Sequence, residues 1–190
     1  MGRNSFVCLL AAWLTPIPLA TEPARLTVLV YNNAGIRPNA LRKSLQVAQS
    51  LFERARVPTE WRAVGAEAPP SRCSLMLRIL NGHSRLPDAT EAFGAAMIPG
   101  PGERAYLADI FYGNVQEALA RQTIETAILL GHVMAHEVGH LLLGRGHSED
   151  TIMRRTWDKR VFELMSVSQL TFSRTEAAQL RSAVALRLTK

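Results

Sequence analysis

Residues 135–153 read AHEVGHLLLGRGHSEDTIM, and this stretch holds the residue types of a zinc site. On a helix, His136 and His140 would lie about 40° apart around the axis and about 6 Å apart along it, so both imidazoles could reach one ion. Neutral imidazole is a good zinc ligand. Glu137 would project beside the metal, where a general base for a metal-activated water molecule is needed. The spacing therefore predicts a hydrolytic Zn2+ centre rather than an apolar helix end that happens to carry histidines.

A third ligand is needed, because a catalytic zinc site has three protein ligands and one open position. His147 is the candidate, but on a continued helix it would lie about 10 Å beyond His140 along the axis. Gly144 and Gly146 resolve this difficulty, since glycine readily adopts positive φ and ends helices. We therefore expect the chain to turn at these glycines and to bring His147 back to the metal.

Other residues compete for the third position. Glu163 would be the ligand in the zinc-peptidase architecture that takes a glutamate from a second helix. Glu149 and Asp150 also lie near the motif in the sequence. We favour His147 because the glycines explain its geometry and nothing comparable supports the acids. His132, one turn before the motif, is expected to face solvent or to hold a ligand in place rather than to bind the ion.

The elements that must position these residues alternate in type, as in an α/β fold. Strands are predicted at residues 24–35, 59–65, 73–82 and 104–113, an amphipathic helix at 40–57, and one long helix from Val115 to about Leu143. Residues 93–102 read FGAAMIPGPG and predict a short edge strand followed by a loop. Ser173 and Glu176 form a capping-box pattern for a C-terminal helix.

The first twenty residues differ from the rest of the chain. Arg3 precedes the apolar stretch SFVCLLAAWLTPIPLA, which is short for a membrane span and contains two prolines. We interpret residues 1–20 as a secretory signal peptide cleaved near Ala20, with an uncleaved anchor as the alternative. Residues 21–190 would then form a single domain, secreted or periplasmic, with no stable insertion in a membrane.

Composition narrows the class of protein. The 190 residues are 47% hydrophobic and 20% charged, which allows a core to form. The net charge of +6 falls to +5 without the signal peptide, because Arg3 is the only charged side chain there. The arginines are scattered rather than arranged in a basic stripe with aromatics, which argues against nucleic-acid binding. Cys8 lies in the signal peptide, so Cys73 is left alone and is expected to be a buried thiol.

The stretch HEVGHLLLGRGHS resembles the extended HExxHxxGxxH motif of the metzincin clan of zinc metallopeptidases, with one extra residue between His140 and the glycine. GHSEDTIM is similar to the matrixin version, in which a serine follows the third histidine and a short loop leads to a methionine. By this resemblance, Met153 belongs to a methionine turn that forms an apolar base beneath the ligands. Some families of the clan have a tyrosine just after this methionine, where this chain has MRRTW.

The resemblance implies a small α/β (α+β) catalytic domain with a twisted mixed sheet, a long active-site helix and a C-terminal helix. A peptide or protein substrate would lie extended along an edge strand, for which FGAAMI is the candidate. The first predicted strand follows the signal peptide closely, which leaves no room for a long pro-segment or a cysteine switch. We therefore expect either no latency or inhibition by a separate protein.

Four basic residues follow the methionine, and they have two interpretations: they favour acidic substrates, or they form a plain solvated surface, which is the simpler expectation. These residues are Arg154, Arg155, Lys159 and Arg160.

Three functions fit these observations. The first is a secreted zinc-dependent endopeptidase that uses Glu137 as general base. The second is a secreted module that holds zinc for binding or structure without turnover, although such a module has no need of the Glu137 carboxylate. The third is an amidase that acts on cell-wall peptides with the same zinc chemistry, which only a comparison of substrates would distinguish.

Overall fold

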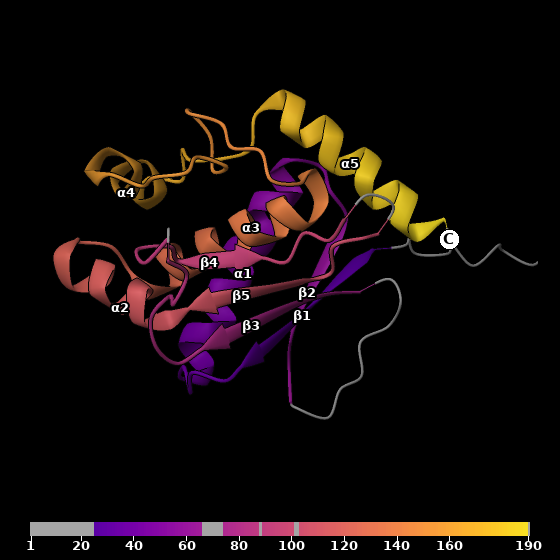
Figure 1. Ribbon diagram of the computed structural model, residues 1–190. Coiled ribbons are helices and arrows are strands. Elements are labelled where there is room, and N and C mark those ends of the chain that lie inside the picture. The colour runs from indigo at the N-terminus through magenta and orange to yellow at the C-terminus, as the bar shows by residue number, and fades with distance from the viewer. Residues whose placement is uncertain (1–24, 66–73, 88, 101–102, 190) are drawn as a thin grey trace, which may run out of the picture.

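The computed structural model describes residues 25–65, 74–87, 89–100 and 103–189. Within this part of the chain, five strands form one sheet in the order β2-β1-β3-β5-β4 (Figure 1). The strands are β1 (Leu26–Asn32), β2 (Thr59–Val64), β3 (Ser74–Leu80), β4 (Gly94–Ala96) and β5 (Leu107–Phe111). The first three and β5 are parallel, and β4 runs antiparallel to β5 at the edge. The mixed sheet and the short edge strand expected from the sequence are therefore confirmed.

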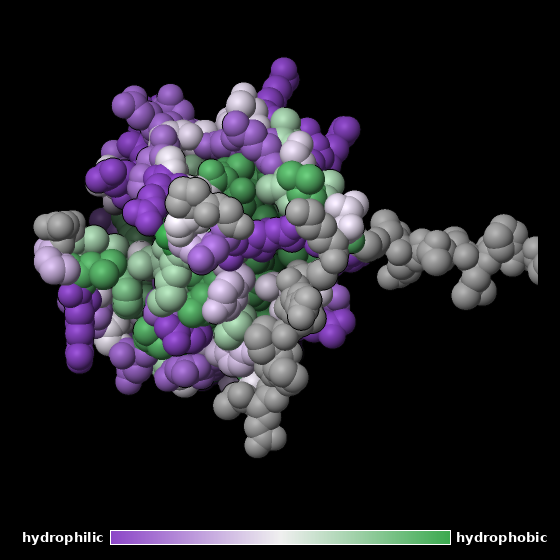
Figure 2. Space-filling model, turned by 45° about the vertical axis from the view of Figure 1, so that its right-hand side comes forward, coloured by the Kyte–Doolittle hydropathy of each residue, from purple (hydrophilic) through white to green (hydrophobic). Residues whose placement is uncertain are grey.

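Helices α1 and α3 pack side by side on one face of the sheet, and α5 lies against α3 (Figure 1). The helices are α1 (Pro38–Arg54), α2 (Tyr112–Arg121), α3 (Thr126–Leu143), α4 (Lys159–Ser166) and α5 (Arg174–Leu188). The core lies between the sheet and these helices, where Phe52, Leu77, Ile110 and Met134 are fully buried. Figure 2 shows one face of the molecule, on which polar side chains predominate and apolar side chains gather in patches between them.

Apolar spacing explains why α1 and β3 form where they do. The residues of α1 predicted to share one face are buried, namely Leu41, Leu45, Ala48, Leu51 and Phe52. In β3 the burial alternates, since Leu75, Leu77 and Ile79 are buried while the residues between them are half-exposed. Both patterns place apolar side chains in the interface between helix and sheet, where burial of apolar surface stabilises the fold.

The single helix expected over residues 115–143 is wrong: two helices, α2 and α3, occupy this stretch. The chain is extended at Gln122, with φ −125° and ψ 145°, and again at Glu125. Thr123 and Ile124 lie between them, and β-branched side chains lose rotamer freedom in a helix. The break lets α3 enter the core while α2 stays at the surface with few buried residues.

Helix α3 is the central helix of the fold. By length and composition it could cross a membrane, but 72% of it is buried inside the protein, as expected of a core helix. It contacts α1, α2, α4, α5 and three of the strands. A side chain on α3 is therefore held by packing on nearly every side, which suits a helix that carries reactive groups.

Candidate metal centre

Helix α3 carries the first two histidines and the glutamate of the motif. His136 and His140 are 9% and 8% exposed, and Glu137 is 4% exposed. All residues from 129 to 141 are buried, so these three side chains have little freedom to move. The helix ends at Leu143, three residues after His140, and thus accommodates the extra residue of the motif as one more helical residue.

The chain reverses direction at Gly144. Its φ of 91° and ψ of −160° lie in a region that essentially only glycine adopts. The Gly144 N–H donates to the carbonyl of His140 at 2.9 Å, and the Gly144 carbonyl accepts from Nδ1 of the same histidine at 2.8 Å. Gly146 does not have a positive φ. The turn therefore depends on one glycine, and the expectation that both glycines provide it is corrected.

This turn brings His147 beside the two helix histidines. One ring nitrogen from each of His136, His140 and His147 lies within 4.8 Å of the others. The ring centre of His147 is 4.7 Å from that of His140 and 5.8 Å from that of His136. Three imidazoles that are separated in sequence thus face one point, as a metal ion requires.

Hydrogen bonds fix the tautomers of the two helix histidines. Nδ1 of His136 donates to the Ile152 carbonyl at 2.7 Å, and Nδ1 of His140 donates to the Gly144 carbonyl at 2.8 Å. Each Nε2 therefore keeps its lone pair, and the two Nε2 atoms are 3.0 Å apart. Two lone pairs at this distance repel each other unless a cation binds them. The donor set fits a zinc ion, which binds neutral imidazoles oriented by such outer hydrogen bonds.

Burial keeps the histidines in the neutral form. Burial, followed by the proximity of His140, lowers the pKa of His136 to about 3. Burial also lowers the pKa of His140, and burial together with His140 and Arg155 lowers the pKa of His147. A metal ion binds imidazole only in its unprotonated form, so the three rings are ready to bind at neutral pH.

Glu137 lies between α3 and the edge strand β4. Burial raises the pKa of its carboxyl group to about 8, while a hydrogen bond from the main chain of Ala96 acts in the opposite direction. Its Oε2 atom is buried, and no described residue hydrogen-bonds to it. A Cβ atom at Gly94 would lie 2.7 Å from the Glu137 side chain and 2.7 Å from the main-chain oxygen of Asp109. The edge strand therefore supports this carboxyl group and leaves one oxygen available for a proton.

Met153 packs beneath the ligand helix. It is 1% exposed, and its Sδ atom lies so close to Gly139 that a Cβ atom at this glycine would clash with it. The Met153 N–H donates to Thr151 Oγ1 at 3.1 Å, and the Met153 carbonyl accepts from the Ser148 N–H at 3.0 Å. The turn thus presses an apolar side chain against α3 next to His140. That this side chain supports a bound metal stays a prediction.

The acids that competed for the third position do not join the histidines. The Glu163 side chain is 66% exposed and lies 4.0 Å from Lys159 on the same helix. Glu149 and Asp150 are exposed in the loop after His147. Within the described part of the chain, the potential metal cluster consists of the three histidines alone.

Two further expectations have different outcomes. His132 does not face solvent, because it is 2% exposed and its Nδ1 bonds with the Ile128 carbonyl at 2.8 Å. Cys73 and the proposed signal peptide, residues 1–20, lie outside the described residues.

A cavity of about 980 Å³ opens beside the histidines. Its walls come from β4 and the loop before it, from α2, and from residues 154–157. The Trp157 ring centre lies 5.6 Å from that of His136 and 5.4 Å from that of Phe93, so this indole joins the two walls next to a ligand. No motif in the sequence pointed to Trp157, whose only signal was an aromatic residue shortly after the methionine.

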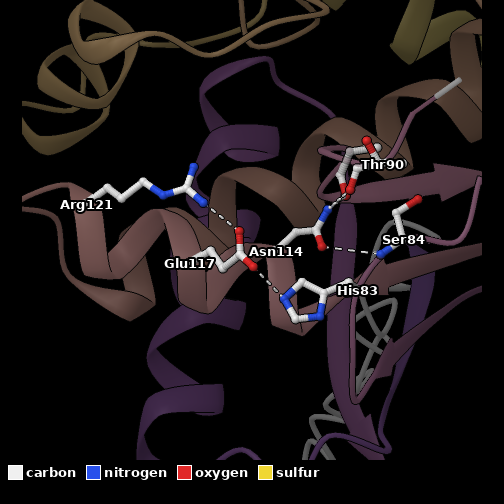
Figure 3. Close-up of polar contacts among 7 residues, drawn as sticks. His83, Ser84, Thr90, Asn114, Glu117 and Arg121 are labelled. Carbon is white, nitrogen blue, oxygen red and sulfur yellow. Dashed lines mark hydrogen bonds and ion pairs between the residues drawn. The ribbon is translucent and has the colours of Figure 1, made fainter.

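Asn114 on α2 anchors the loop that leads into the edge strand (Figure 3). Its amide nitrogen donates to the carbonyls of Thr90 and Ala92 at 2.7 and 2.8 Å, and its Oδ1 accepts from the Ser84 N–H at 3.3 Å. Asn114 is 6% exposed, so these bonds satisfy a buried amide. One side chain therefore fixes the main chain on the approach to β4, and no pattern in the sequence indicated this role.

Glu117, one turn further along α2, forms two ion-pair contacts at the rim of the cavity (Figure 3). One carboxylate oxygen lies 2.8 Å from Nε2 of His83, and the other lies 2.6 Å from the guanidinium of Arg121. All three side chains are more than half exposed, so the contacts add little to stability. The charges of Glu117 and Arg121 neutralise each other, so this pair adds no net charge to the wall of the cavity formed by α2.

Comparison with solved structures shows which proteins share this fold. No protein-family model matches the chain, and no curated protein sequence matches it. Solved structures do match. A zinc-dependent peptidase from Methanocorpusculum labreanum aligns with a TM-score of 0.57 and 15% identity over 80% of this chain and 99% of its own. The archaemetzincin from Methanopyrus kandleri aligns with a TM-score of 0.62 and 15% identity over 88% of this chain and 99% of its own.

A third structure, metalloproteinase-II from Bacteroides fragilis, aligns with a TM-score of 0.53 and 14% identity over 88% of this chain and 55% of its own. The fold is that of zinc peptidases. At identities this low the comparison concerns the fold alone, so the chemistry must be argued from the site. The site contributes a histidine cluster that could hold zinc.

Proposed function

We propose that the protein is a zinc-dependent endopeptidase of the metzincin type. The observation that carries the proposal is the combination of three converging histidines with a buried glutamate that has a free oxygen. A structural zinc site closes its coordination with protein ligands, whereas three ligands and an adjacent carboxylate are the composition of a hydrolytic site. The shared fold with solved zinc peptidases supports the same conclusion.

His136, His140 and His147 would hold the ion through ring nitrogens. Zinc bound there would supply Lewis-acid activation of water and of the substrate carbonyl. The carbonyls of Ile152 and Gly144 hold the first two rings in the tautomer that leaves Nε2 free. Such outer hydrogen bonds orient a ligand and make it more basic.

Glu137 would act as the general base. Its Oε2 is the unpaired buried acceptor at the site, so it can take a proton from the attacking water and later release it to the departing amine. In the metal-free protein, burial holds the pKa near 8, and a cation nearby would favour the ionised carboxylate. The main-chain bond from Ala96 keeps the carboxyl group in position during the transfer.

The substrate would lie along β4 in an extended conformation. The Phe93 carbonyl and the Met97 N–H bond to β5, at 2.8 and 2.9 Å. In an antiparallel ladder alternate residues direct their main-chain groups the other way, so the main-chain groups of Gly94 and the Ala96 carbonyl face the open edge, while the Ala96 N–H bonds to Glu137. A peptide could pair with these groups by strand addition while its scissile bond lies near the histidines. This arrangement favours peptide or protein substrates over small molecules.

We also propose that the protein works outside the cytoplasm. The support is the pattern of residues 1–20, with a positive start, an apolar stretch and a small residue at its end. Expression of the full chain with fractionation of the culture, followed by N-terminal sequencing of the exported form, tests this. We expect a new N-terminus near Thr21, and retention of Met1 in a membrane fraction would indicate an anchor instead.

Peptide cleavage by the Glu137→Gln variant tests the enzyme proposal. The purified wild type, reconstituted with zinc, should cleave members of a quenched fluorescent peptide library and should stop when a chelator is added. Glu137→Gln should keep its zinc and lose activity by about 10²–10⁴-fold, because an amide cannot accept the proton. Zinc binding without cleavage of any peptide by the wild type would instead favour a zinc-holding module. Turnover of cell-wall peptide fragments alone would favour the amidase alternative.

A further inference from the structure

The four basic residues that follow Met153 divide into two pairs. Arg154 and Arg155 line the cavity beside the histidines, whereas Lys159 and Arg160 are exposed on α4 and do not line it. The solvated surface that was the simpler expectation therefore applies to the second pair only.

Three of the four described arginines that line the cavity are free of ion pairs, the exception being Arg121. No described carboxylate lies within ion-pair distance of Arg145, Arg154 or Arg155, all of which line the cavity. The guanidinium of Arg145 donates to the Ile98 carbonyl at 2.9 Å, which leaves its charge uncompensated. The Nε atom of Arg154 is buried and has no hydrogen-bond partner among the described residues. A buried donor without a partner costs free energy, so the described residues do not satisfy this guanidinium fully.

The acids of the cavity do not balance these three charges. Glu117 is paired with Arg121, and Glu137 belongs to the catalytic group. Glu91, on the loop before β4, is the acid that remains among the described lining residues. A cavity with an excess of fixed positive charge raises the local concentration of anionic ligands and steers them inward.

We propose that Arg154 and Arg155 form a subsite for a carboxylate side chain of the substrate, so that the enzyme prefers peptides with Asp or Glu near the cleaved bond. This inference rests on the endopeptidase function proposed above. Guanidinium and carboxylate match in geometry and charge, and their hydrogen bonds are among the stronger ones in proteins. Arg155 is exposed and free to reach the substrate, while Arg154 is held partly within the wall.

A charge reversal with a matched control tests the subsite. The probes are quenched fluorescent peptides identical except for Glu, Gln or Lys at each position around the cleaved bond. We expect the wild type to favour Glu over Lys at one position by about tenfold or more in kcat/KM. Arg155→Glu should reverse this preference, with most of the change in KM, and added salt should weaken it. Arg160→Glu introduces the same charge outside the cavity and should leave the preference unchanged.

The outcomes separate the two proposals. Equal cleavage of the Glu, Gln and Lys peptides by the wild type, or an equal effect of Arg155→Glu and Arg160→Glu, would overturn the subsite and leave the endopeptidase intact. Failure of the wild type to cleave any peptide would overturn both. Zinc content should be measured for each variant. If the reversed charge in Arg155→Glu displaces the metal, Arg155→Gln replaces it in the test, because this variant removes the positive charge without adding a negative one.

Glu176, which the sequence predicted only as part of a capping box, forms hydrogen bonds through both oxygens of its carboxylate. The box is present at the start of α5, where Ser173 Oγ accepts from the Glu176 N–H at 3.1 Å and Glu176 Oε2 accepts from the Ser173 N–H at 2.7 Å. The other oxygen, Oε1, accepts from Ser148 Oγ at 2.5 Å and from Thr151 Oγ1 at 2.9 Å. The carboxylate is 6% exposed, so it joins two segments inside the protein.

The segment that Glu176 holds is the one that carries the third ligand. Ser148 directly follows His147, and Thr151 lies two residues before Met153. Residues 144–158 contain no helix or strand, so tethers of this kind determine where the His147 ring lies. We infer that Glu176 is a positioning residue for the metal centre, acting through Ser148 on His147.

Two serines on opposite sides of Glu176 make a matched pair of tests. Ser148→Ala removes a bond to the ligand loop, and Ser173→Ala removes a bond to the helix cap. We expect Ser148→Ala to weaken zinc binding by about 10–100-fold, measured by competition with a chromogenic chelator. Ser173→Ala should lower the melting temperature of the metal-free protein and leave the zinc affinity unchanged. Glu176→Gln should retain much of the cap, since glutamine also forms capping boxes, and should weaken zinc binding.

Hydrogen exchange in the metal-free protein gives a second readout that does not depend on activity. Ser148→Ala should speed exchange of the amides in residues 144–153, and Ser173→Ala should speed it in the first turn of α5. The inference is overturned if Ser148→Ala keeps the affinity of the wild type for zinc, or if Ser173→Ala weakens zinc binding as much. The peptidase proposal is tested by cleavage and not by affinity, so the two failures are distinguishable.

Discussion

The two halves of the metal centre are built in different ways. His136, Glu137 and His140 project from a helix that is buried on nearly every side. His147 is exposed and comes from a loop without regular structure. The helix half is fixed by packing, which involves many contacts that no single substitution removes. The loop half is fixed by a few identifiable atoms, namely the Gly144 turn, the Ser148 hydroxyl and the Met153 side chain.

Because the two halves are held differently, single substitutions should affect them differently. A change of Glu137 in the helix half should alter the chemistry while the metal stays bound. Changes in the loop half should alter metal binding while the fold stays intact.

Replacing His147 by Ala should produce the largest change. It removes a ligand, so zinc affinity should fall well beyond the roughly 10–100-fold that loss of an outer partner causes. Glu163→Ala is the control, because its side chain is exposed away from the histidines. Chelator competition measures both. Retention of zinc by His147→Ala together with its loss from Glu163→Ala would show that the site has the glutamate-ligand architecture.

The glycines of the loop should differ from each other. Gly144→Ala forces an L residue into φ 91° and should cost about 1–3 kcal/mol of unfolding free energy, with weaker zinc binding. Gly146→Ala should be nearly neutral, because this glycine has no positive φ and a Cβ atom there would meet nothing within 4 Å. Denaturant titration of both variants measures the difference. Equal costs would contradict the assignment of the turn to Gly144.

The contribution of Glu137 to the stability of the metal-free protein should fall as pH rises through the neutral range. The pKa of Glu137 is raised to about 8, so the folded protein binds a proton that the unfolded chain releases near pH 4.5. The contribution of this proton to the free energy of unfolding is fully present below about pH 4.5. It decreases between pH 4.5 and about pH 8, by at most about 1.4 kcal/mol per pH unit.

The histidines act oppositely, because burial lowers the pKa of His132, His136, His140 and His147. Their contribution makes stability rise with pH through about 6.5, where the unfolded histidines are half deprotonated, and it levels off about one pH unit higher. Glu137→Gln keeps these histidines, so the difference in stability between the wild type and this variant isolates Glu137. Urea unfolding of both proteins between about pH 5 and pH 8 should show that the wild type loses stability relative to the variant as pH rises. A difference that does not change with pH would assign the proton to another group.

The smallest change is expected for Met153→Leu. The two side chains have similar volume, so the loss of unfolding free energy should stay below about 1.5 kcal/mol. If Met153 supports the ligands, the variant should also bind zinc more weakly, and this loss of affinity should be larger than the small loss of unfolding free energy can explain. Thermal melting with and without zinc separates the two effects. A variant with the stability and affinity of the wild type would show that Met153 only fills space beside Gly139.

The sequence predicted the helix half of the site well because its geometry is local. Residues four apart on a helix must share a face, so the pairing of His136 with His140 followed from spacing alone. The strands and α1 were predicted for the same reason, since their apolar periodicity reports directly on burial. The break between α2 and α3 was missed because the stretch is apolar and rich in helix formers on both sides of Gln122.

Contacts that join distant segments left no signal in the sequence. The capping-box pattern predicted the bond of one Glu176 oxygen at the start of α5, but nothing near Glu176 indicates that the other oxygen holds the ligand loop 25 or more residues earlier. Trp157 and Asn114 are similar cases, because their partners are set by the fold. The roles of the two glycines were not separable either, since glycine permits a positive φ without requiring it.

Gly94 has a consequence for anyone who redesigns this protein. The strand that would receive the substrate leaves no room for a side chain at this position, because a Cβ atom would press on Glu137 and on the main chain of β5. A library built to change cleavage preference should therefore leave position 94 as glycine and vary the opposite wall, residues 154–157. Selection from such a library would preserve the catalytic group while it explores new substrates.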